Sequence, residues 1–174
     1  MDALKRAELE LAQEIDRQVD LVYSSAGIAL HRHWSWGSLR IRRLFDLTVD
    51  VWGECGGVND TSMLQLLEDE TGVELKIPDT DKGWREIAFL NAKLRRMSRA
   101  QQIYMRQRQK QWVSAQAMAC MALALHRKDG FGATRIIRLM GQIDDVKEEF
   151  NFDRTSLLAA CESEAGVALR KEKV

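Results

Sequence analysis

The chain has 174 residues, of which 45% are hydrophobic and 7% aromatic. These apolar side chains suffice for the core of one ordinary domain or two small ones, so disorder is not expected. The 26 basic and 26 acidic side chains cancel, and three widely spaced cysteines fit a reducing cytoplasm better than a disulfide or metal framework. The N-terminus lacks the apolar run of a signal peptide, and the longest apolar run, 117–125, is far shorter than a membrane span. We therefore expect a cytoplasmic protein with no membrane partner.

The first third of the chain predicts three consecutive helices. An apolar stripe with helical spacing covers 19–30, and the aromatic-glycine pair at 36–37 then predicts a tight turn. A second apolar stripe covers 41–55, and a third segment starts at a threonine able to cap a helix and stops at a glycine, 61–72. A single proline and many helix-forming residues indicate an all-α fold.

The same pattern then occurs a second time. Residues 29–44 and 124–139 share Ala-Leu-His-Arg, an aromatic-glycine pair and Arg-Ile-x-Arg-Leu, and residues 61–75 return at 155–169. Such a repeat predicts one supersecondary unit built twice and packed as a pseudo-symmetric pair. Between Trp84 and Arg127 no proline or glycine occurs, which fits one long helix or two helices broken near 98–101. The predicted organisation is repeat unit 1 at 1–76, a linker with the start of the central helix at 77–95, and repeat unit 2 at 96–174.

Charge is distributed unevenly along this chain. The stretch 87–128 contains no Asp or Glu, so the excess of acid lies elsewhere in the sequence. Its cations are suited to neutralising phosphates, and its aromatic residues are suited to stacking on bases. The alternative is a solvated helix face packed against the acidic remainder of the chain, but we favour a nucleic-acid or acidic partner. The candidate binding residues are Lys93, Arg95, Arg96, Arg99, Tyr104, Arg106, Arg108, Lys110 and Trp112.

A second candidate site is the corner after the first helix of each unit. A helix, a turn with glycine and a helix that begins with arginines resembles a DNA-binding helix-turn-helix, in which the second helix enters the major groove. The usual spacing between a small residue and the turn glycine is absent, so we favour the alternative that these arginines are solvated, with Arg42 and Arg43 near Asp46 at helical spacing. The residues that would read DNA are Arg40, Arg42, Arg43, Arg135 and Arg138.

The sequence offers little for catalysis or metal binding. His31, His33 and Cys55 lack the paired spacing of a zinc site, and no cysteine has a neighbouring histidine that would form a catalytic pair. No glycine-rich phosphate loop occurs. We therefore expect a binding protein that is not an enzyme and carries no cofactor or metal.

The segments Trp34-Ser35-Trp36-Gly37-x-x-Arg40-Ile41 and Gly130-Phe131-Gly132-x-x-Arg135-Ile136, each followed downstream by Glu-Thr-Gly-Val or Glu-Ala-Gly-Val, carry a family resemblance. Together they resemble small helical proteins encoded by phages and prophages of Firmicutes. Some phage proteins of such bacteria are anti-CRISPR inhibitors, so the resemblance implies a location in the bacterial host cell and a host target.

Three functional hypotheses follow from the sequence. The first is a phage accessory protein that binds and inhibits a host nucleoprotein, such as a CRISPR nuclease (Cas9), through its basic helix. The second is a DNA-binding regulator or accessory factor of the helix-turn-helix type, and the third is an assembly module whose basic face meets an acidic protein. Self-association stays open in each case.

Overall fold

The computed structural model describes residues 2–55, 62–75, 93–94 and 96–169. Within these ranges the chain forms α-helices and no β-strand, which confirms the predicted all-α class. None of the described helices combines the length and hydrophobicity that crossing a bilayer requires. The helices are α1 (Ala3–Trp34), α2 (Ser38–Glu54), α3 (Ser62–Thr71), α5 (Arg99–Asp129), α6 (Ala133–Glu149) and α7 (Arg154–Ala165).

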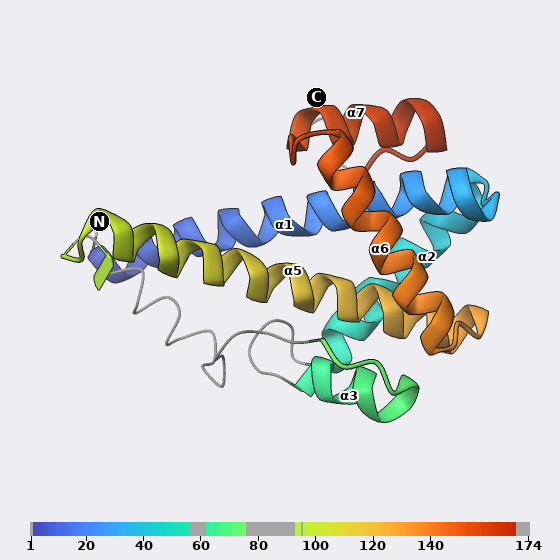
Figure 1. The fold of residues 1–174 in the computed structure, drawn as a ribbon, viewed down its shortest axis with the longest axis horizontal. Helices are drawn as coiled ribbons and strands as arrows, with labels where there is room; N and C mark the ends of the chain where they lie inside the picture. The colour runs from blue at the N-terminus through green and yellow to red at the C-terminus, as the bar shows by residue number, and fades with distance from the viewer. Residues whose placement is uncertain (1, 56–61, 76–92, 95, 170–174) are drawn as a thin grey trace.

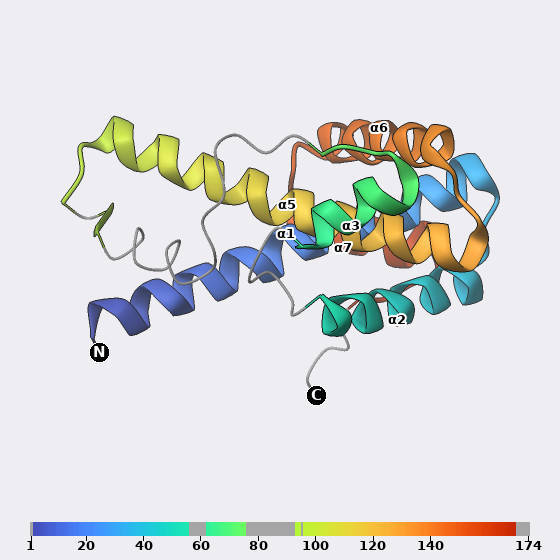
Figure 2. The same cartoon turned by 90° about the horizontal axis from the view of Figure 1, so that it is seen from below.

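The two long helices, α1 and α5, run through the whole length of the molecule. They lie side by side with their N-termini at the same end, and the four short helices gather around their C-terminal halves (Figure 1). Toward their N-termini α1 and α5 diverge from each other (Figure 2). The N-terminal halves of both helices therefore extend beyond the part of the molecule that the short helices cover.

The start of α5 shows that the central stretch does not form one continuous helix, because α5 begins at a capped N-terminus. The Ser98 hydroxyl accepts a hydrogen bond from the backbone N–H of Gln101, whose side chain accepts one from the backbone N–H of Ser98. This reciprocal capping box satisfies backbone donors at a helix start. Lys93 and Leu94 are helical ahead of it. The chain therefore breaks near Ser98, and residues 84–92 lie outside the described residues.

Helix packing crosses the boundary between the predicted units. The extensive contacts of α1 are with α7, α6 and α5, whereas α5 packs on α2 and α3. Contact between α1 and α2, which follow each other in the chain, is slight. The contact between α1 and α7 is close, because a Cβ on Gly27 would lie 2.9 Å from the Sγ atom of Cys161. Each long helix is thus covered by the short helices of the other sequence repeat.

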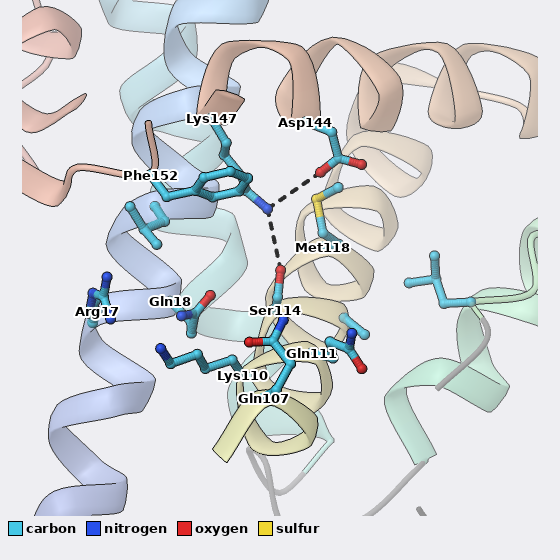
Figure 3. A pocket seen from close by; sticks show the side chains of 13 residues that line it. Arg17, Gln18, Gln107, Lys110, Gln111, Ser114, Met118, Asp144, Lys147 and Phe152 are labelled. Carbon is cyan, nitrogen blue, oxygen red and sulfur yellow. Dashed lines mark hydrogen bonds and ion pairs between the residues drawn. The ribbon is translucent and has the colours of Figure 1, made fainter. Parts of the chain in front are cut away.

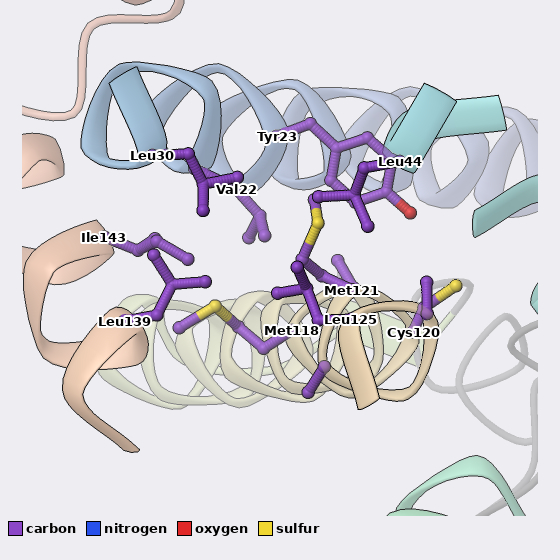
Figure 4. Packing of buried hydrophobic residues seen from close by; sticks show 14 of the residues in the cluster. Val22, Tyr23, Leu30, Leu44, Met118, Cys120, Met121, Leu125, Leu139 and Ile143 are labelled. Atoms are coloured by element: carbon purple, nitrogen blue, oxygen red, sulfur yellow. The ribbon is translucent and has the colours of Figure 1, made fainter. Parts of the chain in front are cut away.

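One hydrophobic core joins the C-terminal halves of α1 and α5 to the short helices. Val22 and Leu30 of α1 face Leu139 and Ile143 of α6 across this core (Figure 4). Core residues recur with the spacing that the sequence predicts for the second helix of each repeat. Those of α2 are Ile41, Leu44, Phe45, Thr48 and Val51, and those of α6 are Ile136, Leu139, Ile143, Val146 and Lys147.

An arginine near the end of each long helix ties it to two short helices. Arg32 of α1 lies 2.7 Å from Glu149 of α6 and 2.8 Å from Glu164 of α7. Bidentate guanidinium contacts of this kind fix geometry as well as charge. The hydrogen bonds from Arg32 hold the pKa of Glu164 below its usual range.

Arg127 of α5 stands at the matching position of the second repeat. It lies 2.6 Å from Glu54 of α2 and 2.8 Å from Glu70 of α3. Its hydrogen bonds likewise hold the pKa of Glu70 low. These contacts account for four of the acidic residues outside the basic stretch, Glu54, Glu70, Glu149 and Glu164. Their partners, Arg32 and Arg127, occupy matching positions in the two repeats.

Candidate functional site

The corner arginines at the start of α2 contact groups within the chain. Arg40 forms an ion pair with Asp129 at 2.8 Å, and its guanidinium carbon lies 3.8 Å from the centre of the Trp36 ring. Arg42 donates a hydrogen bond of 2.8 Å to the backbone carbonyl of Gly166. Both side chains therefore stabilise the junction of α2 with the end of α5 and the segment after α7.

The corner arginines of α6 lie against aromatic rings. Arg135 lies 5.8 Å from the centre of the Phe131 ring, and Arg138 lies 5.6 Å from that of Trp34. Arg43 is exposed on α2. Four of the five arginines of the helix-turn-helix hypothesis thus have contacts within the chain, and all five residues are exposed, so their role in reading DNA stays a prediction.

The basic stretch lies on the projecting half of α5 and just before it. Tyr104 is 58% exposed and Ile103 is 62% exposed. Arg108 is half-buried, with its guanidinium carbon 5.3 Å from the centre of the Tyr104 ring. Arg95 lies outside the described residues, and Lys110 is half-buried. The exposed cations of this stretch are Lys93, Arg96, Arg99 and Arg106.

Trp112 requires a correction to the set of predicted binding residues. Its side chain is 0% exposed, so its indole ring cannot stack on a base in this structure. The acid-free stretch contains both exposed and buried residues, since α5 is exposed at its start and buried in the core further along. An absence of acidic residues does not distinguish an exposed basic face from a buried helix face, because a buried face lacks acidic residues as well.

The acidic part of α1 lies beside part of the basic stretch. Two grooves between the projecting halves of α1 and α5, of about 510 and 200 Å³, are both lined by Glu10, Glu14, Arg17 and Arg106. The packing of basic residues against acidic ones, which is the alternative weighed from the sequence, therefore applies to Arg106. Neither of these two grooves is lined by Arg96 or Arg99.

A larger cleft of about 610 Å³ lies where α1, α5 and α6 meet. Three cations from three helices line it: Arg17 of α1, Lys110 of α5 and Lys147 of α6 (Figure 3). The carboxylate on its wall is that of Asp144, and its remaining walls are the Ser114 hydroxyl, amides and apolar side chains. Its volume falls in the range of small-molecule sites, about 300–1,000 Å³.

Lys147 is the unusual residue of this cleft. It is 6% exposed, and its ammonium group donates a hydrogen bond of 3.3 Å to the Ser114 hydroxyl and lies 3.5 Å from Asp144. Burial lowers the pKa of this lysine, because the charged form loses hydration that the solvated Asp144 carboxylate does not fully replace. The cleft therefore contains a cation that a bound anion would stabilise.

Phe152 covers one side of the cleft from the loop after α6. Its side chain is 48% exposed and lines the cleft, and its backbone φ is 55°, in the left-handed region. The preceding Asn151 has a φ of 51°. A bulky residue with positive φ is strained, and such strain is concentrated at functional sites. The Phe152 backbone N–H donates a hydrogen bond of 2.9 Å to the Lys147 carbonyl, which ties the loop to the end of α6.

The buried thiols are not arranged for nucleophilic chemistry. Burial raises the pKa of both Cys120 and Cys161 to about 12, so both are protonated at neutral pH. Among the described residues, no group of three or more His, Cys, Asp or Glu side chains could hold a metal ion. The histidines that the repeat shares cap their corners: His31 Nδ1 lies 3.1 Å from the Trp36 carbonyl.

Lys147, Arg17 and Ser114 are absent from the sequence-based prediction of the site. One signal in the sequence points to Lys147, which stands at the position that Trp52 occupies in the first repeat. Comparison of the chain with protein-family models, curated proteins and solved structures gives no match.

Proposed function

We propose that the chain is a non-catalytic binding protein that engages nucleic acid, free or within a nucleoprotein, through the exposed basic face at the start of α5. The observation that carries this proposal is the exposure of Arg96 and Arg99 on a projecting, acid-free segment. Following the resemblance to phage proteins, the nucleoprotein we propose as target is a host CRISPR nuclease, which this chain would inhibit.

The spacing of the exposed residues supports a contact surface. Arg99 and Ile103 are four residues apart, so they lie on one face of α5. Tyr104, adjacent to this face, offers an exposed ring for stacking on a base. Guanidinium groups next to an exposed ring provide the phosphate contacts and stacking contacts typical of proteins that bind single strands.

The matching contacts of the two repeats support a further part of the proposal, that the molecule is a duplicated unit packed as a pseudo-symmetric pair. His31 Nδ1 lies 3.1 Å from the Trp36 carbonyl, and in the second repeat His126 Nδ1 lies 2.8 Å from the Phe131 carbonyl. Arg32 and Arg127 contact matching pairs of carboxylates, each on the short helices of the other repeat.

The test is fluorescence anisotropy of labelled single-stranded and duplex DNA, titrated with the protein at several salt concentrations. Because each phosphate contact adds about one unit to the slope of log affinity against log salt, we expect the R96E/R99E variant to lower that slope by about two units. Arg106 is left unchanged, since a glutamate there would face Glu10 and Glu14 and lower stability for another reason.

The matched control is K5E/K128E, which changes the net charge equally on exposed residues outside the basic face and outside the corner arginines. Its DNA affinity should fall far less than that of R96E/R99E. Equal losses in the two variants would show that only net charge matters and would overturn the proposed face. If wild-type protein fails to bind DNA at low salt, the same variants are tested for capture of a nuclease–guide complex, and failure there rejects the function.

A further inference from the structure

The cleft between α1, α5 and α6 has a different chemistry from the exposed face of α5. We propose that it binds a small organic phosphate, a phosphate monoester attached to a flat ring, of about nucleotide size. This site is separate from the proposed nucleic-acid face, since neither Arg96 nor Arg99 lines the cleft. The argument depends on charge, on space and on the ring of Phe152.

Charge in the cleft favours an anion. Arg17, Lys110 and Lys147 bring three positive charges, of which Lys147 lies 3.5 Å from Asp144 and Arg17 lies 3.9 Å from Glu14, so the cations outnumber the carboxylates that contact them by one. A phosphate monoester carries a charge of about −1.5 to −2 at neutral pH and offers three acceptor oxygens. The three cations come from three different helices, so they approach from different sides, as Figure 3 shows for Lys110 and Lys147.

The space in the cleft exceeds what a phosphate group needs. The open cleft has a volume of about 610 Å³, which leaves room for a ring and a sugar beside the phosphate. Gln107 and Gln111 of α5 line the wall and can both donate and accept hydrogen bonds. Met118 and Leu21 supply apolar surface deeper in the cleft. A ligand with one anionic end and one flat, hydrogen-bonding end fits these walls better than inorganic phosphate alone.

Phe152 is positioned to contact the ring of such a ligand. Its half-exposed side chain lines the cleft, and its strained backbone is bonded to Lys147, the residue that would meet the phosphate. An exposed aromatic ring contributes stacking energy to a bound base. The same short loop thus places an aromatic contact and a buried cation at one site.

The matching corner of the first repeat shows that this space is not required by the fold. There the position of Lys147 is taken by Trp52, whose Nε1–H donates a hydrogen bond of 3.1 Å to the Tyr23 hydroxyl. The repeat can therefore fill this corner with aromatic side chains. In the second repeat the corner is instead open and lined by cations. A buried cation lowers the stability of the fold unless a bound ligand compensates its charge.

Isothermal titration calorimetry with adenosine 5′-monophosphate, at fixed neutral pH and moderate salt, tests the site. We expect saturable binding of this probe, binding of adenosine weaker by at least about tenfold, and a loss of similar size for K147M. K128M, which removes an exposed lysine outside the cleft, is the matched control and should bind as the wild type does. Circular dichroism establishes that each variant is folded.

Two further titrations define the ligand. F152A should weaken binding of the nucleotide and leave binding of inorganic phosphate unchanged, because the ring contacts only the organic part. A 5′-phosphorylated hexanucleotide, compared with its unphosphorylated form, distinguishes a strand end from a free nucleotide as the source of the phosphate, and either source supports the site. Nucleotide binding by K147M within twofold of wild type, or no saturable binding of any of these probes, overturns it.

Discussion

The corner around Trp52 and the cleft around Lys147 occupy matching positions in the sequence repeat, yet they have different chemistry. Trp52 is hydrogen-bonded to Tyr23, and the Tyr23 ring stacks on that of Phe45 with their centres 5.3 Å apart. Lys147 is hydrogen-bonded to a serine and faces a cleft of about 610 Å³. The matching pairs are Trp52 and Lys147, Tyr23 and Met118, Phe45 and Met140, and Val19 and Ser114.

This difference separates what the fold needs from what it tolerates. Three aromatic side chains pack the first corner, whereas lysine and two methionines stand at the matching positions of the second. Methionine adapts to irregular space, and a buried lysine lowers stability because its charge loses hydration. Since the helix ends around both corners are held by the same arginine–glutamate contacts, the difference lies in the corner itself and is a candidate for function.

The largest expected effect is the loss of the packed corner. W52A removes the indole ring and its hydrogen bond to Tyr23, and the half-buried position predicts a loss of about 2 kcal/mol or more in the free energy of unfolding. W52F keeps a ring and loses only the hydrogen bond, so it should lose about 1 kcal/mol. Urea unfolding followed by circular dichroism measures both. A W52A variant as stable as wild type would show that this corner does not support the fold.

The opposite sign is expected at the cleft. K147M keeps the length of the side chain and removes a buried charge, so without ligand at neutral pH it should be more stable than wild type by about 1 kcal/mol, a rise in Tm of about 2–4 °C. Because burial lowers the pKa of Lys147, its destabilising effect is complete below the folded-state pKa and disappears as pH rises above the unfolded value of 10.5. The gain should therefore shrink in alkaline solution. A decrease in Tm at neutral pH would mean that the contacts of Lys147 with Ser114 and Asp144 stabilise the fold.

The helical periodicity of the sequence was sufficient to predict the all-α class and most of the buried face of α2 and α6. It did not predict which helices pack together, since the apolar face of α1 is the same whether α2 or α7 covers it. The glycine at position 27 allows α7 to approach closely, since a Cβ there would lie 2.9 Å from the Cys161 Sγ atom. A glycine within a helix does not by itself identify the helix that packs on it.

The candidate site was predictable only in part. Charge patterning identified Arg96 and Arg99 as exposed cations, because a run of basic residues without acids is solvated at least in part. It also included Trp112, which is buried, since composition does not give the depth of a helix in the core. The cleft unites residues from α1, α5 and α6 that are up to 130 positions apart, and no local pattern links them.

The smallest expected effect belongs to the arginine contacts, where the two repeats have the same chemistry and should respond alike. The pKa values of Glu70 and Glu164 are low because Arg127 and Arg32 donate hydrogen bonds to the carboxylates. Their stabilisation is therefore present above the usual carboxyl pKa of 4.5 and is lost as pH falls through the lowered folded-state value. Because these pairs are partly exposed, each contributes less than about 1 kcal/mol.

E70Q and E164Q should each lower the free energy of unfolding by about 0.5 kcal/mol at pH 7, and the deficit should shrink as pH falls below 4.5 and the wild-type carboxyl groups become protonated. E68Q, on the same helix as Glu70 and exposed, is the control and should change little. Urea unfolding at a series of pH values gives all three curves. Equal deficits for E70Q and E164Q would place the difference between the repeats in the Trp52 and Lys147 corners, whereas unequal deficits would show that the two repeats differ in their shared contacts as well.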